Sequence, residues 1–398
     1  MIFQIASRNL TRDKRRTFIT SLMLIFSAVL VSFILGLSDG SYSKIINLFT
    51  RNYTGHFKIE TKKYVDENLL YYTIKDTASV EKELESNSEV LSYTKRSFSG
   101  GLVFSNKKTF GASLVGVDWK REEGITEISK RLQENFEFQN GEYQVALGFK
   151  LAKYFGLKVG DELVVIGSGA DGSIANDVFT VKSIFKEDSG ERDDYAVYMD
   201  LDTFNEYHTL AGVHEYSVLT KNIANSRSTA KKFKVSDDLI ARPWQEVEED
   251  FYISMDKDKQ GTNVSLLIIM FVVGLGVMNT ILMSILERTK EFGLMKALGT
   301  TPSDISKIII LESFFLATIS IVIGVSIGAI CNYLLARNGI AIEPISYGGM
   351  VMDTMIAENS VRTVLFPTIL LYVTTMIATI FPIVKANQVS PIESMRGH

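Results

Sequence analysis

Few residues in this chain are of types that catalyse reactions or bind metal ions. Its four histidines show no ligand spacing, and its one cysteine, Cys331, lies in an apolar stretch. No Gly-Lys dipeptide occurs in the 398 residues, so a P-loop that would cradle nucleotide phosphates is impossible. The sequence therefore predicts a chain that binds no metal or cofactor, forms no internal disulfide and is not an enzyme.

The most specific pattern lies in Glu287–Ser306, which reads ERTKEFGLMKALGTTPSDIS. Phe292, Met295 and Leu298 recur three residues apart, which predicts one apolar face of a short helix that Gly299 ends. From these residues alone, such a helix could dock a partner or rest on lipid headgroups.

A second helix is expected to begin just after this one. Thr301 is a capping residue, Pro302 suits the first helical position, and Asp304 stands where an acid supports the first turn. Glu312 then lies one to two turns inside an apolar stretch, where an unpaired charge is costly. We expect it to pair with Arg288 or Lys307 as a structural link; the alternative is an interfacial carboxylate that reaches water.

These residues must be positioned by membrane-spanning helices. Four stretches without charged residues are long enough to cross a bilayer: Phe18–Leu37, Val264–Leu286, Ser313–Ala336 within a span at 307–336, and Thr363–Val384. The first could instead be a cleaved signal peptide, but it is long for a signal core and no A-x-A site follows. We predict four spans, with the domain at 38–263 between the first two.

The distribution of basic residues predicts the orientation. Eleven Lys and Arg residues lie in or next to three short segments, residues 1–17, 287–306 and 385–398, whereas the loop at 337–362 holds only two. The positive-inside rule places both termini in the cytoplasm. Residues 38–263 are then outside; with 29 Lys/Arg and 37 Asp/Glu they are acidic, which argues against nucleic-acid binding.

The outer domain is predicted to be α+β, with two subdomains. Strands are expected at His56–Glu60, Gly101–Ser105, Phe110–Val117, Leu157–Ile166 and Asp177–Phe185. Helices are expected at Thr77–Glu85, Tyr143–Gly156, Leu201–Tyr207 and Ser226–Phe233. Tyr42–Phe49 and Trp244–Met255 could extend the neighbouring spans as stalks or pack as domain helices.

The segment Glu287–Gly299 resembles the coupling-helix motif of the FtsX-like/MacB-type ABC transporter permease family, roughly E-R-x-x-E-[IF]-G-[LI]-x-[KR]-A-[LI]-G. Further similarities are Leu311-Glu312, the run Pro382, Ala386, Pro391-Ile392-Glu393 and Arg396, and Ala6–Leu10, which looks like the family's amphipathic elbow. With the layout of one span, a large domain and three spans, the resemblance covers the whole chain.

The resemblance implies a multi-pass permease of the bacterial inner membrane that works with a cytoplasmic ABC ATPase dimer, which binds the ATP and magnesium, and with a second permease, identical or related. The residues it implies for ATPase coupling are Glu287, Arg288, Glu291, Phe292, Gly293, Met295, Lys296, Leu298 and Gly299. Phe292, Met295 and Leu298 would seat in a groove on the ATPase, with Arg288, Glu291 and Lys296 at its rim.

Within the family, the chain looks closest to the lipoprotein-releasing LolC/LolE permeases, because its length, its start at the elbow and Gly55–Ile59 are similar to theirs. MacB-like efflux and FtsX-like signalling to a cell-wall hydrolase are the alternatives. The loop Gly167–Asp177 departs from LolC because it is short and lacks proline and aromatic residues, which puts docking of a periplasmic carrier in doubt.

A lipoprotein substrate would need an apolar cleft beside the membrane lipids. We expect it in the outer halves of the first two spans, at Leu30, Phe33, Ile34, Leu37, Leu267, Met270 and Phe271. Any one of these side chains could instead simply face lipid. Gly324 and Gly328 in the third span form a G-x-x-x-G pattern that predicts close helix packing.

Overall fold

The computed structural model describes residues 14–126, 128, 132, 138, 141–185, 194–233, 236–347 and 350–389. The expected elbow up to residue 13 and the tail from residue 390 lie outside this range. The chain divides into two compact units. Of the described residues, those within 14–44, 255–342 and 354–389 form the helical unit, and those within 45–254 and 343–353 form the β-rich unit.

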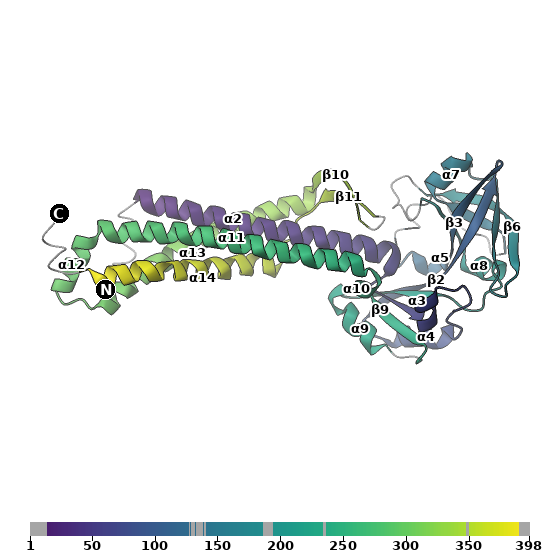
Figure 1. The fold of residues 1–398 in the computed structure, drawn as a ribbon, viewed down its shortest axis with the longest axis horizontal. Coiled ribbons are helices and arrows are strands. Elements are labelled where there is room, and N and C mark those ends of the chain that lie inside the picture. The colour runs from purple at the N-terminus through teal and green to yellow at the C-terminus, as the bar shows by residue number, and fades with distance from the viewer. Residues whose placement is uncertain are drawn as a thin grey trace. The chain divides into compact units, whose positions relative to one another are not determined.

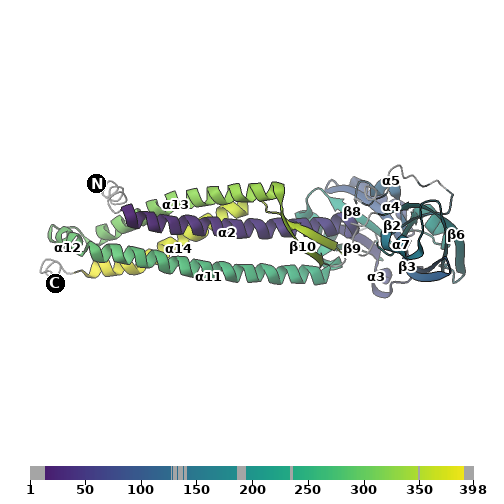
Figure 2. The same cartoon turned by 90° about the horizontal axis from the view of Figure 1, so that it is seen from above.

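Four long helices make up most of the helical unit, where they run side by side (Figure 1, Figure 2). They are α2 (Lys14–Phe49), α11 (Glu249–Glu287), α13 (Pro302–Asn338) and α14 (Val361–Gln388). Each of these helices is long and apolar enough to cross a bilayer. α2 continues without a break to Phe49, as the stalk alternative for that segment expected.

A stripe of small residues brings α2 and α13 together. On α2 the stripe repeats every fourth residue at Ala28, Ser32 and Gly36, so its members share one face. A Cβ added to Gly324 would lie 2.6 Å from the Cβ of Ala28, and one added to Gly328 would lie 2.8 Å from that of Ser32. The close packing predicted for the two glycines of α13 is confirmed.

A short helix, α12 (Thr289–Ala297), connects α11 to α13. Gly299 follows it with a φ of +94°, a left-handed conformation that glycine adopts without strain. The hydroxyl of Thr301 then accepts from the N–H of Asp304 at 3.2 Å, and Pro302 opens α13. The predicted break and cap are confirmed, and together they let α12 leave the direction of its neighbours.

The segment 337–362, predicted only as a loop, contains a two-stranded hairpin of β10 (Ile340–Tyr347) and β11 (Met350–Met355). After it, the N–H of Glu358 donates to the carbonyl of Gly36 at 2.9 Å, and Ser43 donates to the Glu358 carboxylate at 2.7 Å. These bonds attach the connection between α13 and α14 to α2.

The β-rich unit contains one nine-stranded sheet in the order β3-β7-β4-β6-β5-β2-β8-β1-β9, and β3 also pairs with β2. Six strands, β2-β3-β7-β4-β6-β5, therefore close into a barrel, which leaves few open edges. The strands are β1 (Phe57–Thr61), β2 (Val90–Ser105), β3 (Lys108–Val117), β4 (Gln144–Leu147), β5 (Glu162–Ser168), β6 (Ile174–Ile184), β7 (Ala196–Asp200), β8 (Glu215–Thr220) and β9 (Leu239–Pro243).

The two largest hydrophobic cores among the described residues lie along the sheet. One includes Val103, Leu163 and Phe179 from the strands of the barrel, and the other includes Phe57 and Tyr216 from β1 and β8. β2, with 16 residues, takes part in both, because its first half pairs with β8 and its second half with β5. The described residues of this domain form one compact unit on one continuous sheet, so the predicted division into two subdomains is not seen.

Short helices complete this α+β unit; α7 and α8 lie beside the barrel strands in Figure 1. The short helices of this unit are η1 (Thr50–Thr54), α3 (Lys62–Glu67), α4 (Thr77–Ser86), α5 (Trp119–Glu122), α7 (Phe149–Phe155), α8 (Leu201–Tyr207), η2 (Ile223–Asn225), α9 (Ser226–Lys232) and α10 (Trp244–Val247). The predicted helices at Thr77–Glu85, Leu201–Tyr207 and Ser226–Phe233 are confirmed.

The predicted helix at Tyr143–Gly156 is wrong in its first half. Gln144–Leu147 is strand β4, which lies between β6 and β7, and only after Gly148 does α7 begin. All four residues of β4 are buried. A strand covered on both sides shows no alternation of apolar and polar residues, so its pattern is easily taken for part of a helix.

Candidate functional site

The inward face of α12 is anchored in the helical unit. Phe292 is only 2% exposed and packs with Ile285 of α11, Ile305 and Ile309 of α13, and Ala386 of α14. Gly293 is buried as well, and Met295 packs half-buried against the same cluster. These contacts hold α12 against three of the four long helices.

The outward face of α12 presents a different set of side chains. Leu294 and Leu298 are 54% and 79% exposed, and Lys290 and Ala297 are exposed beside them. Leu294 and Leu298 are four residues apart and so share one face. They form an apolar pair that nothing covers among the described residues.

The sequence-based grouping of Phe292, Met295 and Leu298 on one docking face is therefore corrected. A step of three residues falls short of a full helical turn of 3.6 residues. Over six residues, the direction in which the side chain points therefore drifts by about 120° around the helix axis. Phe292 and Leu298 consequently point to different sides of α12. Phe292 serves the chain's own core, whereas Leu294, which was not selected from the sequence for docking, is exposed.

Five charged residues form an ionic chain at this end of the helical unit, alternating in sign. Arg16 lies 3.6 Å from Glu287 and 3.7 Å from Glu312, whose other carboxylate oxygen is 3.3 Å from Arg288. Arg288 in turn pairs with Glu291 at 3.1 Å. The ionic chain Glu287–Arg16–Glu312–Arg288–Glu291 joins α2, α11, α12 and α13.

The geometry contains the expected pair of Glu312 with Arg288, whereas Lys307 pairs with Asp304 at 3.4 Å. Sequence reasoning did not select Arg16, although its position two residues before an uncharged stretch was a usable signal. Glu312 also pairs with Arg16. Both side chains are largely buried, with exposures of 19% for Arg16 and 17% for Glu312.

A small pocket borders the ionic chain. Its walls come from all four long helices and include Arg16, Arg288, Glu312 and Phe292. Other lining residues are apolar or carry hydroxyls, among them Thr20, Val277, Ile281, Ser284, Leu316 and Thr375. Charges that are largely buried, as Arg16, Arg288 and Glu312 are, interact more strongly than charges in open water.

Lys296 has a structural partner inside the chain. Its ammonium group donates to the carbonyls of Ala386, Asn387 and Val389 at 3.2, 2.9 and 2.9 Å. These carbonyls lie at the end of α14, where carbonyl groups lack helical partners and a cation is favourable. Burial lowers the pKa of Lys296. Lys296 therefore caps α14 and is not on the exposed rim that the sequence suggested.

Comparison with known proteins identifies the family. Residues 17–235 match the MacB-like periplasmic core domain, and residues 263–391 match the FtsX-like permease C-terminal region. The chain belongs to the FtsX-like and MacB-like ABC transporter permeases. α12 and Glu312 of this permease lie inside the second match, whereas Arg16 lies outside both.

Relatives of the permease include both bacterial and archaeal proteins. An uncharacterized ABC transporter permease of Methanocaldococcus jannaschii is 27% identical over 276 residues, which are 65% of this chain and 63% of that protein. The lipoprotein-releasing system transmembrane protein LolC of Xylella fastidiosa is 19% identical over 300 residues, 72% of this chain and 73% of that protein. The macrolide export ATP-binding/permease protein MacB of Nitrobacter winogradskyi is 32% identical over 134 residues, 30% of this chain and 20% of that protein.

The residues predicted to line a substrate cleft differ in exposure. Leu267 and Phe271 of α11 are 63% and 67% exposed. Met270 of α11 and four residues of α2, namely Leu30, Phe33, Ile34 and Leu37, are half-buried. Where these two helices of the permease meet, the buried residues are their neighbours Val31, Leu35 and Leu266. The predicted residues thus flank this contact.

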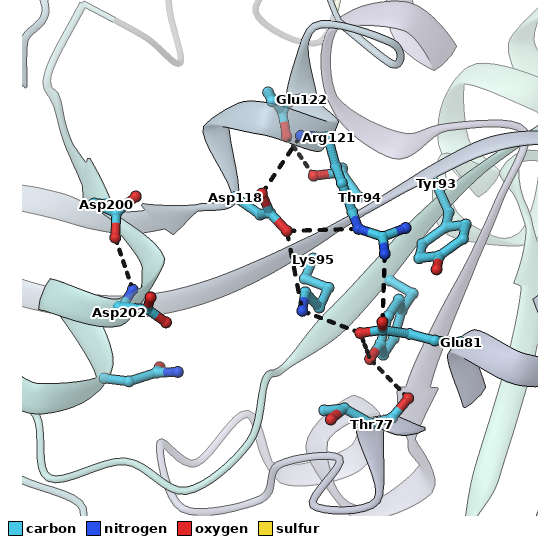
Figure 3. Close-up of polar contacts among 12 residues, drawn as sticks. Thr77, Glu81, Tyr93, Thr94, Lys95, Asp118, Arg121, Glu122, Asp200 and Asp202 are labelled. Atoms are coloured by element: carbon cyan, nitrogen blue, oxygen red, sulfur yellow. Dashed lines mark hydrogen bonds and ion pairs between the residues drawn. The ribbon is translucent and has the colours of Figure 1, made fainter. Parts of the chain in front are cut away.

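The β-rich unit holds a second charged cluster, drawn in Figure 3, around Arg121. The guanidinium of Arg121 lies 4.3 Å from the ring centre of Tyr93 and 3.4 Å from Glu81, which also accepts from Lys95 at 3.0 Å. Each of these charges has a partner of opposite sign. No group of three or more His, Cys, Asp or Glu residues in the described part of the permease could hold a metal ion.

Proposed function

We propose that this permease is the membrane subunit of a lipoprotein-releasing ABC transporter. It couples ATP hydrolysis by a separate cytoplasmic ATPase dimer to extraction of lipoproteins from the outer leaflet of the bacterial inner membrane. In this arrangement both termini and α12 are cytoplasmic, the β-rich unit is periplasmic, and a second permease, identical or related, completes the transporter.

The observation that carries the proposal is the two-sided character of α12. Its inward face is fastened by Phe292, Lys296 and the ionic chain, so a displacement of α12 is passed to the long helices. Its outward face offers Leu294 and Leu298, a small apolar pair that suits a shallow groove on the ATPase. The coupling residues are thus divided between docking at Leu294 and Leu298 and anchoring at Phe292.

The docking assignment is tested by placing a charge in the apolar pair. Leu298→Asp should abolish the MgATPase activity that copurifies with tagged permease from its native membranes. Ser303→Asp is the matched control, because it adds the same charge at an exposed position in the first turn of α13, where an acid is favourable. Loss of activity in both variants, or in neither, would contradict docking through this pair.

The assignment of substrate draws on the match to LolC over 72% of this chain. MacB-like efflux is the second candidate. The short turn between β5 and β6 argues against docking of a periplasmic carrier. That turn, Gly169–Ser173, lacks proline and aromatic side chains with which to hold a periplasmic carrier. Depletion of the permease separates the two, since acylated proteins should accumulate in the inner membrane only if the chain releases lipoproteins.

A further inference from the structure

Arg16 occupies a central place in the ionic chain. Its guanidinium contacts Glu287 at the end of α11 and Glu312 in α13, at 3.6 and 3.7 Å. Glu312 uses one carboxylate oxygen for Arg16 and the other for Arg288. A single carboxylate therefore joins two arginines that lie far apart in the sequence.

Arg288 transmits this arrangement to α12. It directly precedes that helix, pairs with Glu291 in its first turn, and lies 5.4 Å from the ring centre of Phe292. The position of Arg288 therefore depends on where the Glu312 carboxylate is held. Arg16 holds that carboxylate from the side of α2.

We propose that Arg16 is a positioning residue that fixes α12 through Glu312. The ionic chain contains three acids and two arginines. Without Arg16, the Glu312 carboxylate loses its contact on the side of α2, and the link from Glu287 to Glu312 is broken. The loss of these contacts loosens the attachment of α12 to the helical unit while leaving Leu294 and Leu298 intact for docking.

Hydrogen–deuterium exchange on the full chain in lipid nanodiscs tests the positioning directly. Arg16→Gln should raise the exchange of the α12 amides about fivefold, the change expected from losing an interaction near 1 kcal/mol. Arg15→Gln, an exposed neighbour, is the matched control and should leave exchange unchanged. Equal exchange in the wild type and Arg16→Gln would overturn the proposal.

A double-mutant cycle shows whether Arg16 acts through Glu312 or independently. Arg16→Gln combined with Glu312→Gln should raise exchange no more than Glu312→Gln alone, because the second change removes a link that is already broken. Effects that add fully would overturn the proposed route. Arg16→Lys keeps the charge and should restore most of the protection, provided each variant elutes from size exclusion as the wild type does.

The consequence for transport rests on the proposed function. Arg16→Gln should retain copurifying MgATPase activity but release several-fold less lipoprotein per ATP hydrolysed, and Arg16→Lys should recover this ratio. An unchanged ratio in Arg16→Gln would overturn the role in coupling even if exchange rises. Absence of copurifying ATPase in the wild type would count against the proposed function, and exchange would still decide the positioning role.

Discussion

Phe292 and Leu298 show how two apolar residues of one nine-residue helix and its cap acquire different roles. Phe292 lies within a cluster contributed by three long helices, whereas Leu298 is 79% exposed. A similar division separates the two lysines of α12, since Lys290 is exposed and Lys296 donates to three carbonyls at the end of α14. At the scale of single residues, burial and partner decide the role more than residue type.

Lys296→Met should therefore loosen the end of α14. Hydrogen bonds from charged donors contribute about 1.5–3 kcal/mol each when buried, and those of Lys296 are only partly buried, so we expect a loss of about 1–2 kcal/mol. Faster amide exchange over the last turn of α14 would show it. Lys290→Met removes an exposed lysine from the same helix and should change nothing there.

Phe271→Ser tests the predicted cleft at the level of one side chain. If Phe271 contacts acyl chains, its truncation should weaken lipoprotein release while copurifying ATPase activity stays intact, because burial of apolar surface drives that contact. Release from spheroplasts measures the effect. Phe366→Ser, at an exposed phenylalanine of α14, is the control. Equal losses in both variants would indicate a general effect of polarity in the spans.

At the scale of elements, α2 and α13 depend on small residues for their close approach. Hydrophobicity does not drive one membrane helix onto another, because lipid is equally apolar, so packing and polar contacts must hold them. Asn332, which is fully buried, donates to the carbonyl of Ser32, a member of the stripe of small residues, at 3.0 Å. The contact thus combines small residues with one buried hydrogen bond.

Gly328→Leu should separate α2 from α13. The added Cβ would lie 2.8 Å from the Cβ of Ser32, so a helix must move, and such overpacking typically costs about 1–3 kcal/mol. A lower thermal midpoint in detergent is the expected result. Gly261→Leu in α11 is the matched control, because a Cβ there meets open space. A midpoint unchanged by Gly328→Leu would contradict the packing described.

At the scale of the whole molecule, the β-rich unit must be stable without a disulfide, since the chain has a single cysteine. Barrel closure and the buried hydrophobic cores of the sheet contribute to that stability. Three of the four histidines, His56, His208 and His214, lie buried in this unit, where burial lowers the pKa of each; that of His56 falls to about 4, with Arg51 contributing.

Acid should therefore destabilise the β-rich unit. A histidine with a lowered pKa binds fewer protons when folded, so its favourable contribution is intact above pH 6.5 and is lost as the pH falls from there toward 4. For His56 the loss is at most about 3 kcal/mol. Fluorescence of Trp119 and Trp244, both in this unit, reports unfolding.

His56→Asn should reduce this acid sensitivity. His56 accepts from the N–H of Thr220 through Nδ1 at 3.0 Å, and an asparagine oxygen can accept in its place without titrating. The unfolding midpoint should then fall less between pH 6.5 and 4.5 than it does in the wild type. If the unfolding midpoint of His56→Asn depended on pH as that of the wild type does, titrating groups other than His56 would account for the acid sensitivity.

The sequence by itself determined the features that depend on local composition. The apolar spans, the capped break at Gly299 to Pro302 and the separation of α12 from α13 follow from short-range patterns, because helix ends and membrane spans are governed by nearby residues. The sequence left the partner of Glu312 open between Arg288 and Lys307, and the structure pairs it with Arg288. The lack of a P-loop and of metal-ligand spacing was likewise evident from the residues.

Only the tertiary structure decided which faces are covered. The cluster that buries Phe292 includes Ala386 of α14, about 90 residues away in sequence, and Arg16 meets Glu312 across nearly 300 residues. β4 became a strand because β6 and β7 provide its hydrogen bonds, overriding a helical pattern. Such contacts join segments distant along the chain, and no local pattern in a single sequence records them.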